Sequence, residues 1–494
     1  MPNDHLRLHE RHRTSRVGQS RAGHERRVAE RVTATSGQQP KPRTGCGSQR
    51  RDGRARLAVG LTAALVVTLS ACTSSTGLDT AALQRSITHQ ARLAYPTLGI
   101  TATRCRGTGD RNQALTCTVR GPATTLTVQA RPTRHTRIQL EARDAVLPAN
   151  SAAQFVAAHT SIPALVSCGA PTTVIVKPGT LIPCRVAFSD QTTSTAQVQV
   201  LDPDGDVALR TGAFAPAAVT PGGALSWAPV GRTVLGRPLI FTAQSGSVGL
   251  AWLDPGLLHP VLVAGTSDPL GSPGPWGGQV PPSVQPALAA AFNSGFKMGD
   301  IHGGWVGWGT VWRPPEAGDA SLVINTAGQA TVGQFGRDVF SGPDTAYIRQ
   351  NLSLLVDGGV PVPSADNPAV WGASVSGAAT WRSALGVDAH GALVYAAGGG
   401  LTPAALAQAL VAAGVQRGMQ LDINPMWISF NTYQSALDGT VQGTKVFGLR
   451  GDERYLTPDT RDFIAMLVRG VVQPGATGRI GIAPLHQTIR APSG

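Results

Sequence analysis

The order of apolar and polar positions between residues 381 and 430 predicts a strand, a turn, a second strand, a helix and a third strand. Residues 384–387 and 393–396 are short apolar runs on either side of Gly391, which can take the positive φ that a tight turn needs. These two runs therefore predict a β-hairpin. We expect the three consecutive glycines at 398–400 to interrupt the strand pattern that precedes them.

A helix is expected directly after these glycines. Thr402 can cap its first turn, and Pro403 suits the first helical position. Leu406 and Leu410 would share its apolar face, and Gly414 lies where a helix commonly ends. The pattern then returns to a strand.

Polar side chains stand at the ends of these predicted strands, at Arg382, Ser383, Asp422 and Asn424. Asp422 follows a mostly apolar Met-Gln-Leu segment and precedes a loop. A carboxylate at the point where a strand ends and a crevice begins is a common place for ligand binding and chemistry. We therefore treat this end of the predicted sheet as a candidate site.

The pattern ahead of this region contains a repeat. Residues 78–144 and 145–211 each begin with a helical pattern, followed by a cysteine, a loop or strand, a second cysteine and an alternating strand. Leu83 and Ile87 mark the apolar helix face in the first copy, and Phe155 marks it in the second. Each copy predicts a helix packed on a small antiparallel sheet.

Cysteines occur in close pairs within these two copies, at Cys105, Cys117, Cys168 and Cys184. An even set in an exported chain predicts disulfides, and the pairing of Cys105 with Cys117 and of Cys168 with Cys184 is favoured because each pair belongs to one copy. Closing a loop of about 15 residues stabilises a fold by roughly 3 kcal/mol in the chain-entropy model. A zinc site is the alternative, but the sequence has no CxxC motif or neighbouring histidine pair to support it.

The N-terminal segment predicts export. Several arginines precede an apolar stretch at 57–69, which is shorter than the about 20 residues of a membrane-spanning helix but suits the core of a signal peptide at 50–72. The stretch ends in Leu-Ser-Ala-Cys, which is typical of a bacterial lipobox, so we expect Cys72 to carry a lipid. A chance cysteine after a plain signal peptide or a short membrane anchor is the alternative. The polar, Arg-rich residues 1–49 are expected to be disordered.

The charge distribution argues against a nucleic-acid partner. The chain has a net charge of +13, but residues 1–71 alone hold 14 Lys and Arg against 5 Asp and Glu. No basic stripe with interleaved aromatic residues follows them. With 59 Gly and 36 Pro among short apolar runs, the rest of the chain predicts many short strands.

Domain boundaries follow from the same changes in composition. Residues 212–236 are rich in Ala, Pro and Gly and form an expected linker, and residues 237–494 form an expected larger domain. The predicted fold class is α+β, with two small helix-plus-antiparallel-sheet modules followed by a larger mixed α/β domain.

The larger domain carries an ordered set of short motifs. They are Ala-Phe-Asn-Ser-Gly-Phe at 291–296, His-Gly-Gly at 302–304, Trp-Arg-Ser-Ala-Leu-Gly at 381–386 and Leu-Asp at 421–422. In this order, with a hairpin and a helix between the last two, they resemble the phosphodiester glycosidase family, also called the NAGPA or DUF2233 family. The resemblance covers residues 285–435. It implies the hydrolysis of a sugar from a sugar-1-phosphodiester.

By position, this resemblance assigns Asn293, Arg382 and Asp422 to the catalytic site. Arg382 would clamp a phosphate through the planar fork of its guanidinium, and Asn293 would orient a sugar hydroxyl or a phosphate oxygen. Asp422 would act as the general base for water or stabilise an oxocarbenium-like transition state. Further substrate-binding residues are expected at Asn424, Trp427, Arg349, Asn351 and His302.

One departure from the family pattern follows Asp422. The family's Gly-Gly-Gly-Ser is replaced by Ile423-Asn424-Pro425-Met426. Glycine N–H groups can approach an anion closely, whereas Pro425 has no N–H to offer and Ile423 adds bulk. This departure favours the alternative reading, a binding or scaffold lipoprotein of the envelope that keeps the fold without hydrolysis.

The two cysteine modules resemble the DUF4333 family of small domains in actinobacterial exported proteins and lipoproteins. The second copy carries the pattern most fully, with Val166-Ser167-Cys168, then Gly179-Thr180, then Cys184 and a strand. That family implies no chemistry, so we expect spacer or binding modules here.

Together these features predict an exported, lipid-anchored hydrolase on the extracytoplasmic face of the cell membrane. Its expected partner is a carbohydrate or sugar-phosphate polymer of the envelope. No cofactor is firmly implied, and the sequence leaves a divalent cation open.

Overall fold

The computed structural model describes residues 78–492 apart from 108–112, 134–135, 170–171, 214–215, 270–273, 373–377, 437–439 and 474. The predicted basic segment, the signal peptide and the lipid-bearing Cys72 all lie outside the described residues. Within those residues, no helix has both the length and the apolar character needed to cross a membrane. This part of the chain is mostly β-sheet with few helices.

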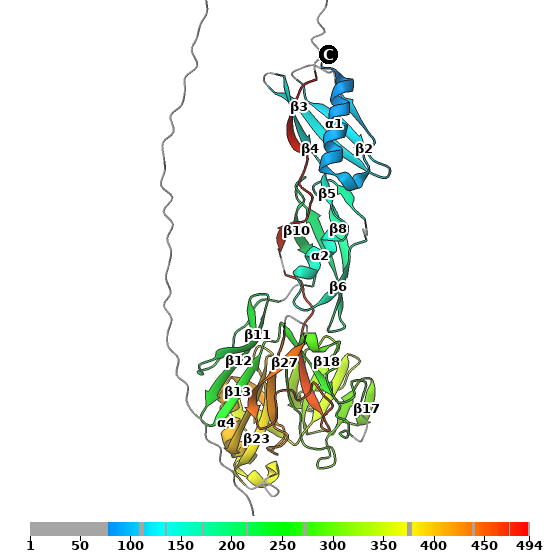
Figure 1. Cartoon of the computed structure of the whole chain (residues 1–494). Coiled ribbons are helices and arrows are strands. Elements are labelled where there is room, and N and C mark those ends of the chain that lie inside the picture. Colours follow the sequence, from blue (N-terminus) through cyan, green and yellow to red (C-terminus); the bar gives the residue numbers. More distant parts are fainter. Residues whose placement is uncertain are drawn as a thin grey trace, which may run out of the picture. The chain divides into compact units, whose positions relative to one another are not determined.

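The first sheet is antiparallel and carries helix α1 on one face (Figure 1). Helix α1, Thr80–Ala94, is capped by Asp79, whose carboxylate accepts hydrogen bonds from the N–H groups of its first turn. Leu83 and Ile87 are buried against the sheet, as their spacing predicts. The strands of this sheet are β1 (Ala102–Arg106), β2 (Leu115–Arg120), β3 (Thr125–Thr133) and β4 (Arg137–Ala142).

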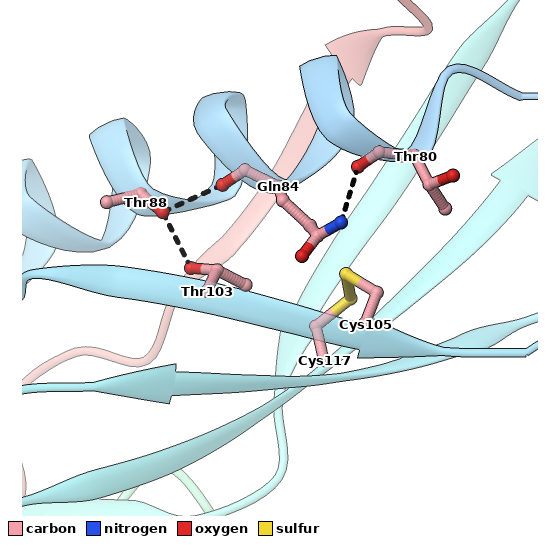
Figure 2. The surroundings of a disulfide bond; sticks show 6 residues. All are labelled: Thr80, Gln84, Thr88, Thr103, Cys105 and Cys117. Atoms are coloured by element: carbon pink, nitrogen blue, oxygen red, sulfur yellow. Dashed lines mark hydrogen bonds between the residues drawn. A yellow bond between two sulfur atoms is a disulfide. The ribbon is translucent and has the colours of Figure 1, made fainter.

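A disulfide and a hydroxyl pair fasten this first module (Figure 2). Cys105 of β1 and Cys117 of β2 are direct cross-strand partners and form a disulfide, which confirms the predicted local pairing. Thr88 Oγ1 of α1 lies 2.8 Å from Thr103 Oγ1 of β1, so the helix is also tied to the sheet through side chains.

A second antiparallel sheet follows helix α2, Ser151–Ala158, whose Phe155 is buried. Cys168, just after β6, forms a disulfide with Cys184 of β8, which confirms the second predicted pairing. The strands of this sheet are β6 (Ala164–Ser167), β8 (Leu181–Phe188), β9 (Thr193–Val200) and β10 (Asp206–Thr211). Strands β5 (Ala145–Leu147) and β7 (Val174–Val176) pair with each other.

The last strands of the chain pair with these two sheets rather than with those of the larger domain (red in Figure 1). Strand β29, Thr477–Arg479, pairs with β10, and β30, His486–Arg490, pairs with β4. Between them Leu485 is buried in the first module, and its N–H donates to the Tyr95 hydroxyl at 2.7 Å. The range assigned from sequence to one C-terminal domain therefore supplies an edge strand to each module.

The larger domain is built around an eight-stranded antiparallel sheet in the order β11-β12-β13-β24-β23-β25-β21-β22. Helix α4, Pro403–Ala412, packs Leu406 and Leu410 against one face of it. The strands are β11 (Ala228–Val234), β12 (Arg237–Ser245), β13 (Val248–Leu253), β21 (Leu354–Asp357), β22 (Val360–Pro361), β23 (Thr380–Asp388), β24 (Leu393–Leu401) and β25 (Val415–Gln420).

The predicted hairpin and helix are confirmed. Strands β23 and β24 pair across a turn in which Gly391 has φ 78°, and the Thr402 hydroxyl accepts from the N–H of Ala405 in the first turn of α4. The predicted interruption at the three glycines is wrong, because β24 continues through them. A Cβ on Gly398 would lie 2.6 Å from the carbonyl oxygen of Ser247, so glycine here allows close strand contact.

Two five-stranded antiparallel sheets, β14-β28-β15-β26-β27 and β17-β16-β20-β18-β19, complete the larger domain. Phe292, Phe430 and Tyr395 pack together in the main core, on the face of the eight-stranded sheet opposite α4. The strands are β14 (Leu258–Val263), β15 (Leu288–Asn293), β16 (Trp305–Gly307), β17 (Thr310–Arg313), β18 (Ala320–Asn325), β19 (Ala330–Gln334), β20 (Thr345–Gln350), β26 (Ser429–Ser435), β27 (Val441–Gly448) and β28 (Phe463–Val468). Within its described residues, α4 is the one α-helix of this domain, so the domain is richer in strands than the mixed α/β domain that we expected.

Candidate active site

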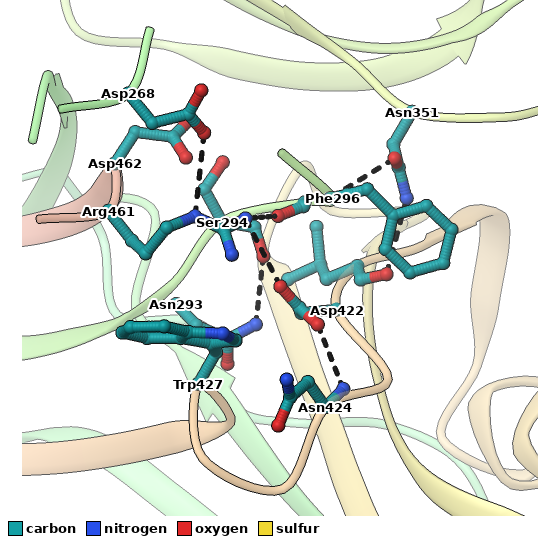
Figure 3. A network of polar contacts seen from close by, with 12 residues as sticks. Asp268, Asn293, Ser294, Phe296, Asn351, Asp422, Asn424, Trp427, Arg461 and Asp462 are labelled. Atoms are coloured by element: carbon teal, nitrogen blue, oxygen red, sulfur yellow. Dashed lines mark hydrogen bonds and ion pairs between the residues drawn. The ribbon is translucent and has the colours of Figure 1, made fainter. Parts of the chain in front are cut away.

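Polar residues gather where strands of several sheets end (Figure 3). Asn293 ends β15, Asp422 follows β25, and Arg461 and Asp462 directly precede β28. Asn293 is the register partner of Phe463, so the end of β15 and the start of β28 lie side by side. The side chains of Asp422 and Arg461 point toward each other across this junction.

The side chain of Asp422 is almost completely buried, with 4% of the residue exposed. Its Oδ1 accepts from the Asn424 N–H at 2.8 Å, and its Oδ2 lies 3.2 Å from Nη2 of Arg461. Burial raises the pKa of Asp422, and the positive charge of Arg461 acts against that shift. A carboxylate with a raised pKa is a better proton acceptor than an ordinary one.

Arg461 holds a second acid at the same time. Its Nε lies 3.4 Å from Oδ2 of Asp268, and its Nη2 donates to the carbonyl oxygen of Gly295 at 2.8 Å. One guanidinium therefore bridges two aspartates and the loop that follows β15. Burial and the negative charge of Asp462 raise the pKa of Asp268.

Asp462 belongs to the same cluster through its own arginine. Its Oδ2 accepts from Arg349 Nε at 2.7 Å and from the Trp305 indole N–H at 3.1 Å. Arg349 also donates to the carbonyl oxygen of Phe296. The sequence assigned Arg349 to substrate binding, and the structure brings it next to the cluster. Its N–H donors there bond to groups of the protein itself.

Buried polar atoms without a hydrogen-bond partner among the described residues concentrate in this cluster. Four of the eight such atoms lie here, namely Ser294 Oγ, Asp268 Oδ2, Asp462 Oδ1 and Arg461 Nε, and of these Asp268 Oδ2 and Arg461 Nε have only their mutual ion-pair contact at 3.4 Å. Each unsatisfied buried group costs about 1–3 kcal/mol, and native proteins seldom keep one without a reason. Such a concentration is typical of a site that completes its hydrogen bonds with a ligand or with water.

Asn293 fills all of its hydrogen-bonding positions within the protein. Its Nδ2 donates to the Ser294 carbonyl at 2.8 Å and to Ser383 Oγ at 3.0 Å. Its Oδ1 accepts from the Tyr395 hydroxyl at 2.8 Å and from the Ser429 N–H at 3.3 Å. Asn293 therefore joins four strands, and the neighbouring Ser294 is the residue here whose hydroxyl is left to meet a ligand.

Arg382 lies on the other face of β23 from Ser383, because side chains alternate along a strand. Ser383 faces the cluster and donates to the Asp422 carbonyl oxygen at 2.9 Å. Arg382 is fully buried on the α4 side, where it donates to the Leu401 carbonyl at 2.9 Å and to Gln420 Oε1 at 2.7 Å. The structure therefore does not bring the guanidinium of Arg382 to the carboxylate of Asp422.

Asn351 supports the strand that leads to Asp422. It is fully buried, and its Nδ2 donates to the carbonyl oxygens of Gln420 at 2.8 Å and Leu421 at 3.2 Å. His302 is exposed, and its electrostatic influence falls on Asp319. Both were predicted to bind substrate. The structure brings Asn351 to the cluster, whereas His302 makes no contact with the cluster residues among the contacts described above.

The segment at residues 423–426 uses its backbone for Asp422 itself. The Asn424 N–H is taken by the Asp422 carboxylate, and Asn424 Oδ1 accepts from the Met426 N–H at 2.9 Å. The Asn424 side chain is exposed. This segment therefore closes on the aspartate and offers that N–H to no outside anion.

Trp427 borders the cluster. The guanidinium carbons of Arg450, Arg454 and Arg461 lie 5.6, 5.7 and 5.3 Å from its ring centroid, within the range of cation–π attraction. Two of these arginines, Arg450 and Arg454, also line a cavity of about 330 Å³, together with residues 451–453, 455 and 457–459. Among the described residues, no group of three or more His, Cys, Asp or Glu is arranged to hold a metal ion.

Sequence reasoning missed Asp268, Ser294, Arg461 and Asp462. The last two directly precede β28, so the rule applied to Asp422, a charge at the end of an apolar strand, also points to them. Asp268 lies in a loop that has no distinguishing sequence pattern.

No protein-family model matches this sequence, and no curated protein matches it. Among solved structures, the chain is similar to the zebrafish N-acetylglucosamine-1-phosphodiester alpha-N-acetylglucosaminidase (NAGPA) catalytic domain auto-inhibited by its pro-peptide, with 14% identity and a TM-score of 0.32 over 52% of this chain and 87% of that one. It is also similar to a hypothetical protein from Synechocystis, with 14% identity and a TM-score of 0.26 over 74% of this chain and 98% of that one. A third similarity is to a putative exported protein from Burkholderia pseudomallei, with 12% identity and a TM-score of 0.14 over 71% of this chain and 74% of that one.

Proposed function

We propose that this protein is a hydrolase that cleaves the glycosidic bond of a sugar-1-phosphodiester in cell-envelope material, exported and anchored to the membrane through Cys72. The observation that carries the proposal is the buried pairing of Asp422 with Arg461, 3.2 Å apart, beside several unsatisfied polar atoms. A proton acceptor and an anion-binding group thus stand together. The ordered motifs of the larger domain supply the reaction class.

In this proposal Asp422 takes the proton of the water that attacks C1 of the sugar. Arg461 offsets the negative charge that develops on the phosphate as the glycosidic bond breaks. Ser294 donates its hydroxyl to the substrate, and Trp427 offers its ring to the sugar. Arg382 becomes a positioning residue, because it holds Gln420 immediately before Leu421 and Asp422.

Asp422 is almost completely buried, so a substrate reaches its carboxylate only if a neighbouring segment moves, and we assign this movement to the loop 423–427 that directly follows it. The loop is held by the Asn424 N–H and by Arg454, which donates to the Trp427 carbonyl at 2.6 Å. Arg450 also donates to the Met426 carbonyl at 3.4 Å, and the buried Ile423 and the three cation–π contacts of Trp427 hold the loop as well. Opening therefore costs more than the about 0.5–1.5 kcal/mol that each hydrogen bond contributes.

A second candidate is a non-catalytic binding or scaffold lipoprotein of the envelope. The observation that favours it is that both oxygens of Asp422 and all four hydrogen-bonding positions of Asn293 are engaged within the protein. In that case the cluster holds strands together and the polymer binds elsewhere.

The test uses the full-length chain in detergent with a hexose-1-phosphate aryl diester. A phosphodiester glycosidase releases free hexose and aryl phosphate, whereas a phosphodiesterase releases hexose-1-phosphate and the phenol. We expect the first pair of products, and loss of at least about 100-fold in kcat on Asp422→Asn. Binding of the diester without turnover would favour the scaffold reading.

The anchor is tested separately in cells. Wild-type chain is expected to incorporate a palmitate label, and the Cys72→Ala chain is expected to lose it. Equal labelling of both would remove the lipobox from the account without touching the proposed reaction.

A further inference from the structure

The cluster holds more buried acids than bases. Asp268, Asp422 and Asp462 are all buried, and they face Arg349 and Arg461. Ionising all three carboxyls would leave a net negative charge with little access to water, which is strongly unfavourable. The arrangement therefore favours one carboxyl that keeps its proton.

The contacts indicate which carboxyl that is. Asp462 has Arg349 Nε at 2.7 Å in addition to an indole N–H. Asp422 accepts a hydrogen bond from a backbone N–H, and its Oδ2 lies 3.2 Å from Nη2 of Arg461. Asp268 accepts one hydrogen bond, from the Met298 N–H at 3.1 Å to Oδ1, and its Oδ2 has only the 3.4 Å ion-pair contact with Arg461.

We propose that Asp268 is the second catalytic carboxyl of this site, the proton donor to the phosphate that leaves the sugar. The proposal rests on the proposed function and names the acid that complements Asp422. Its geometric basis is Arg461, which contacts Asp268 through Nε at 3.4 Å and Asp422 through Nη2 at 3.2 Å, so the two carboxyls share one guanidinium. Paired carboxyls of unequal proton affinity are the machinery of most glycoside hydrolysis.

The step balances as a single displacement. The oxygen of a water molecule forms a bond to C1 while the bond between C1 and the phosphate oxygen breaks. The electron pair of the broken bond goes to the phosphate oxygen, which takes the proton of Asp268, and the water's proton goes to Asp422. The products are the free sugar and a phosphate monoester, and solvent then returns a proton to Asp268 as Asp422 loses one.

An acid is useful here because the departing group is a phosphate monoester. Its second pKa is about 6, so a proton supplied as the bond breaks avoids the full build-up of a dianion beside buried carboxylates. The groups that face Asp268 are Asp462 and Arg349 from the cluster and Arg461 from the start of β28. Asp462 and burial make Asp268 hold its proton more tightly, and the two arginines act in the opposite direction.

The experiment compares pH–rate profiles of the full-length wild type, Asp268→Asn and Asp268→Glu on the hexose-1-phosphate aryl diester. Wild type is expected to lose activity on the alkaline side as Asp268 ionises. Asp268→Asn is expected to be slower by about 100-fold or more and to lack this alkaline limb, because an amide does not titrate. Asp268→Glu is expected to recover part of the rate with a displaced alkaline limb. Asp254→Asn, which removes a buried acid paired with Arg237 outside the cluster, is expected to keep both limbs.

A second readout does not depend on turnover. Difference infrared spectroscopy of the wild type is expected to show a protonated carboxyl that Asp268→Asn lacks and Asp254→Asn retains. An unchanged alkaline limb or a wild-type rate in Asp268→Asn would overturn the proposal. If Asp268→Asn does not fold, an alkaline limb of Asp268→Glu that coincides with the wild type would overturn it. Absence of any turnover by wild type would instead overturn the proposed function, and this role with it.

Discussion

Arg461 Nη2 lies 3.2 Å from the Oδ2 of Asp422, and both side chains are almost fully buried. The two residues come from the ends of different sheets, β25 in the eight-stranded sheet and β28 in a five-stranded one. A charge pair at this junction depends on both sheets keeping their register, so it links the fold of the domain directly to the chemistry that we propose.

Removing Arg461 should move the acidic limb of the rate profile. In Arg461→Met, Asp422 loses the cation that lowers its pKa, so burial raises that pKa further and the base ionises only at higher pH. Breaking a buried pair by removing one partner also costs about 3–5 kcal/mol of stability. Arg461→Lys keeps a charge and should shift the limb less. A limb that stays in place in Arg461→Met, measured by kcat/KM against pH, would contradict the role of this pair.

Arg382 should matter for stability rather than for substrate affinity. Arg382→Lys retains a charge but loses the planar fork that bonds the Leu401 carbonyl and Gln420, and each buried group left unsatisfied costs about 1–3 kcal/mol. We expect a lower unfolding midpoint in denaturant and a reduced kcat, with KM unchanged. A raised KM at unchanged stability would restore Arg382 as a phosphate clamp.

The hairpin and the helix of the larger domain were predictable because the residues that determine them lie within the same short segment of the sequence. Gly391 in the hairpin turn and Thr402 at the helix start act on neighbours within a few residues. The glycines of β24 misled the prediction because their reason is a contact with Ser247, which is distant in sequence.

Part of the candidate site was predictable because two of its residues belong to short sequence motifs. Asp422 and Asn293 were found from strand ends and motif order, and the structure brings them together through Ser383, to which the Asn293 amide donates. The face on which Arg382 stands depends on strand register, and the partners Asp268 and Arg461 depend on the pairing of separate sheets. Neither register nor sheet pairing is encoded in short motifs.

Ionisation of Asp422 should lower the free energy of unfolding as pH rises. Its folded-state pKa is raised above the roughly 3.9 of an unfolded aspartate, so the folded state binds more protons between these two values and wild type loses stability as pH increases through them. Asp422→Asn lacks this loss. The difference in unfolding temperature between the variant and wild type should grow with pH across that window and level off above it. A difference that is constant with pH would contradict the buried ionisation.

The C-terminal segment should stabilise the first module. Leu485→Ala opens a cavity in that core at a cost of about 2–5 kcal/mol and weakens the pairing of β30 with β4. We expect faster hydrogen exchange in peptides that span β4. Leu449→Ala, at a leucine that is 56% exposed, should leave this exchange unchanged. Equal protection of β4 from hydrogen exchange in both variants would mean that the C-terminal segment with β30 contributes little to the stability of the first module.

The most direct measurement of the central claim is the fate of the water oxygen in the reaction. Hydrolysis of the hexose-1-phosphate aryl diester by the full-length chain in water enriched in heavy oxygen should release aryl phosphate that carries no label, because water activated by Asp422 attacks C1 and not phosphorus. Label found on the phosphate, or release of unlabelled aryl phosphate at an equal rate by Asp422→Asn, would contradict the account.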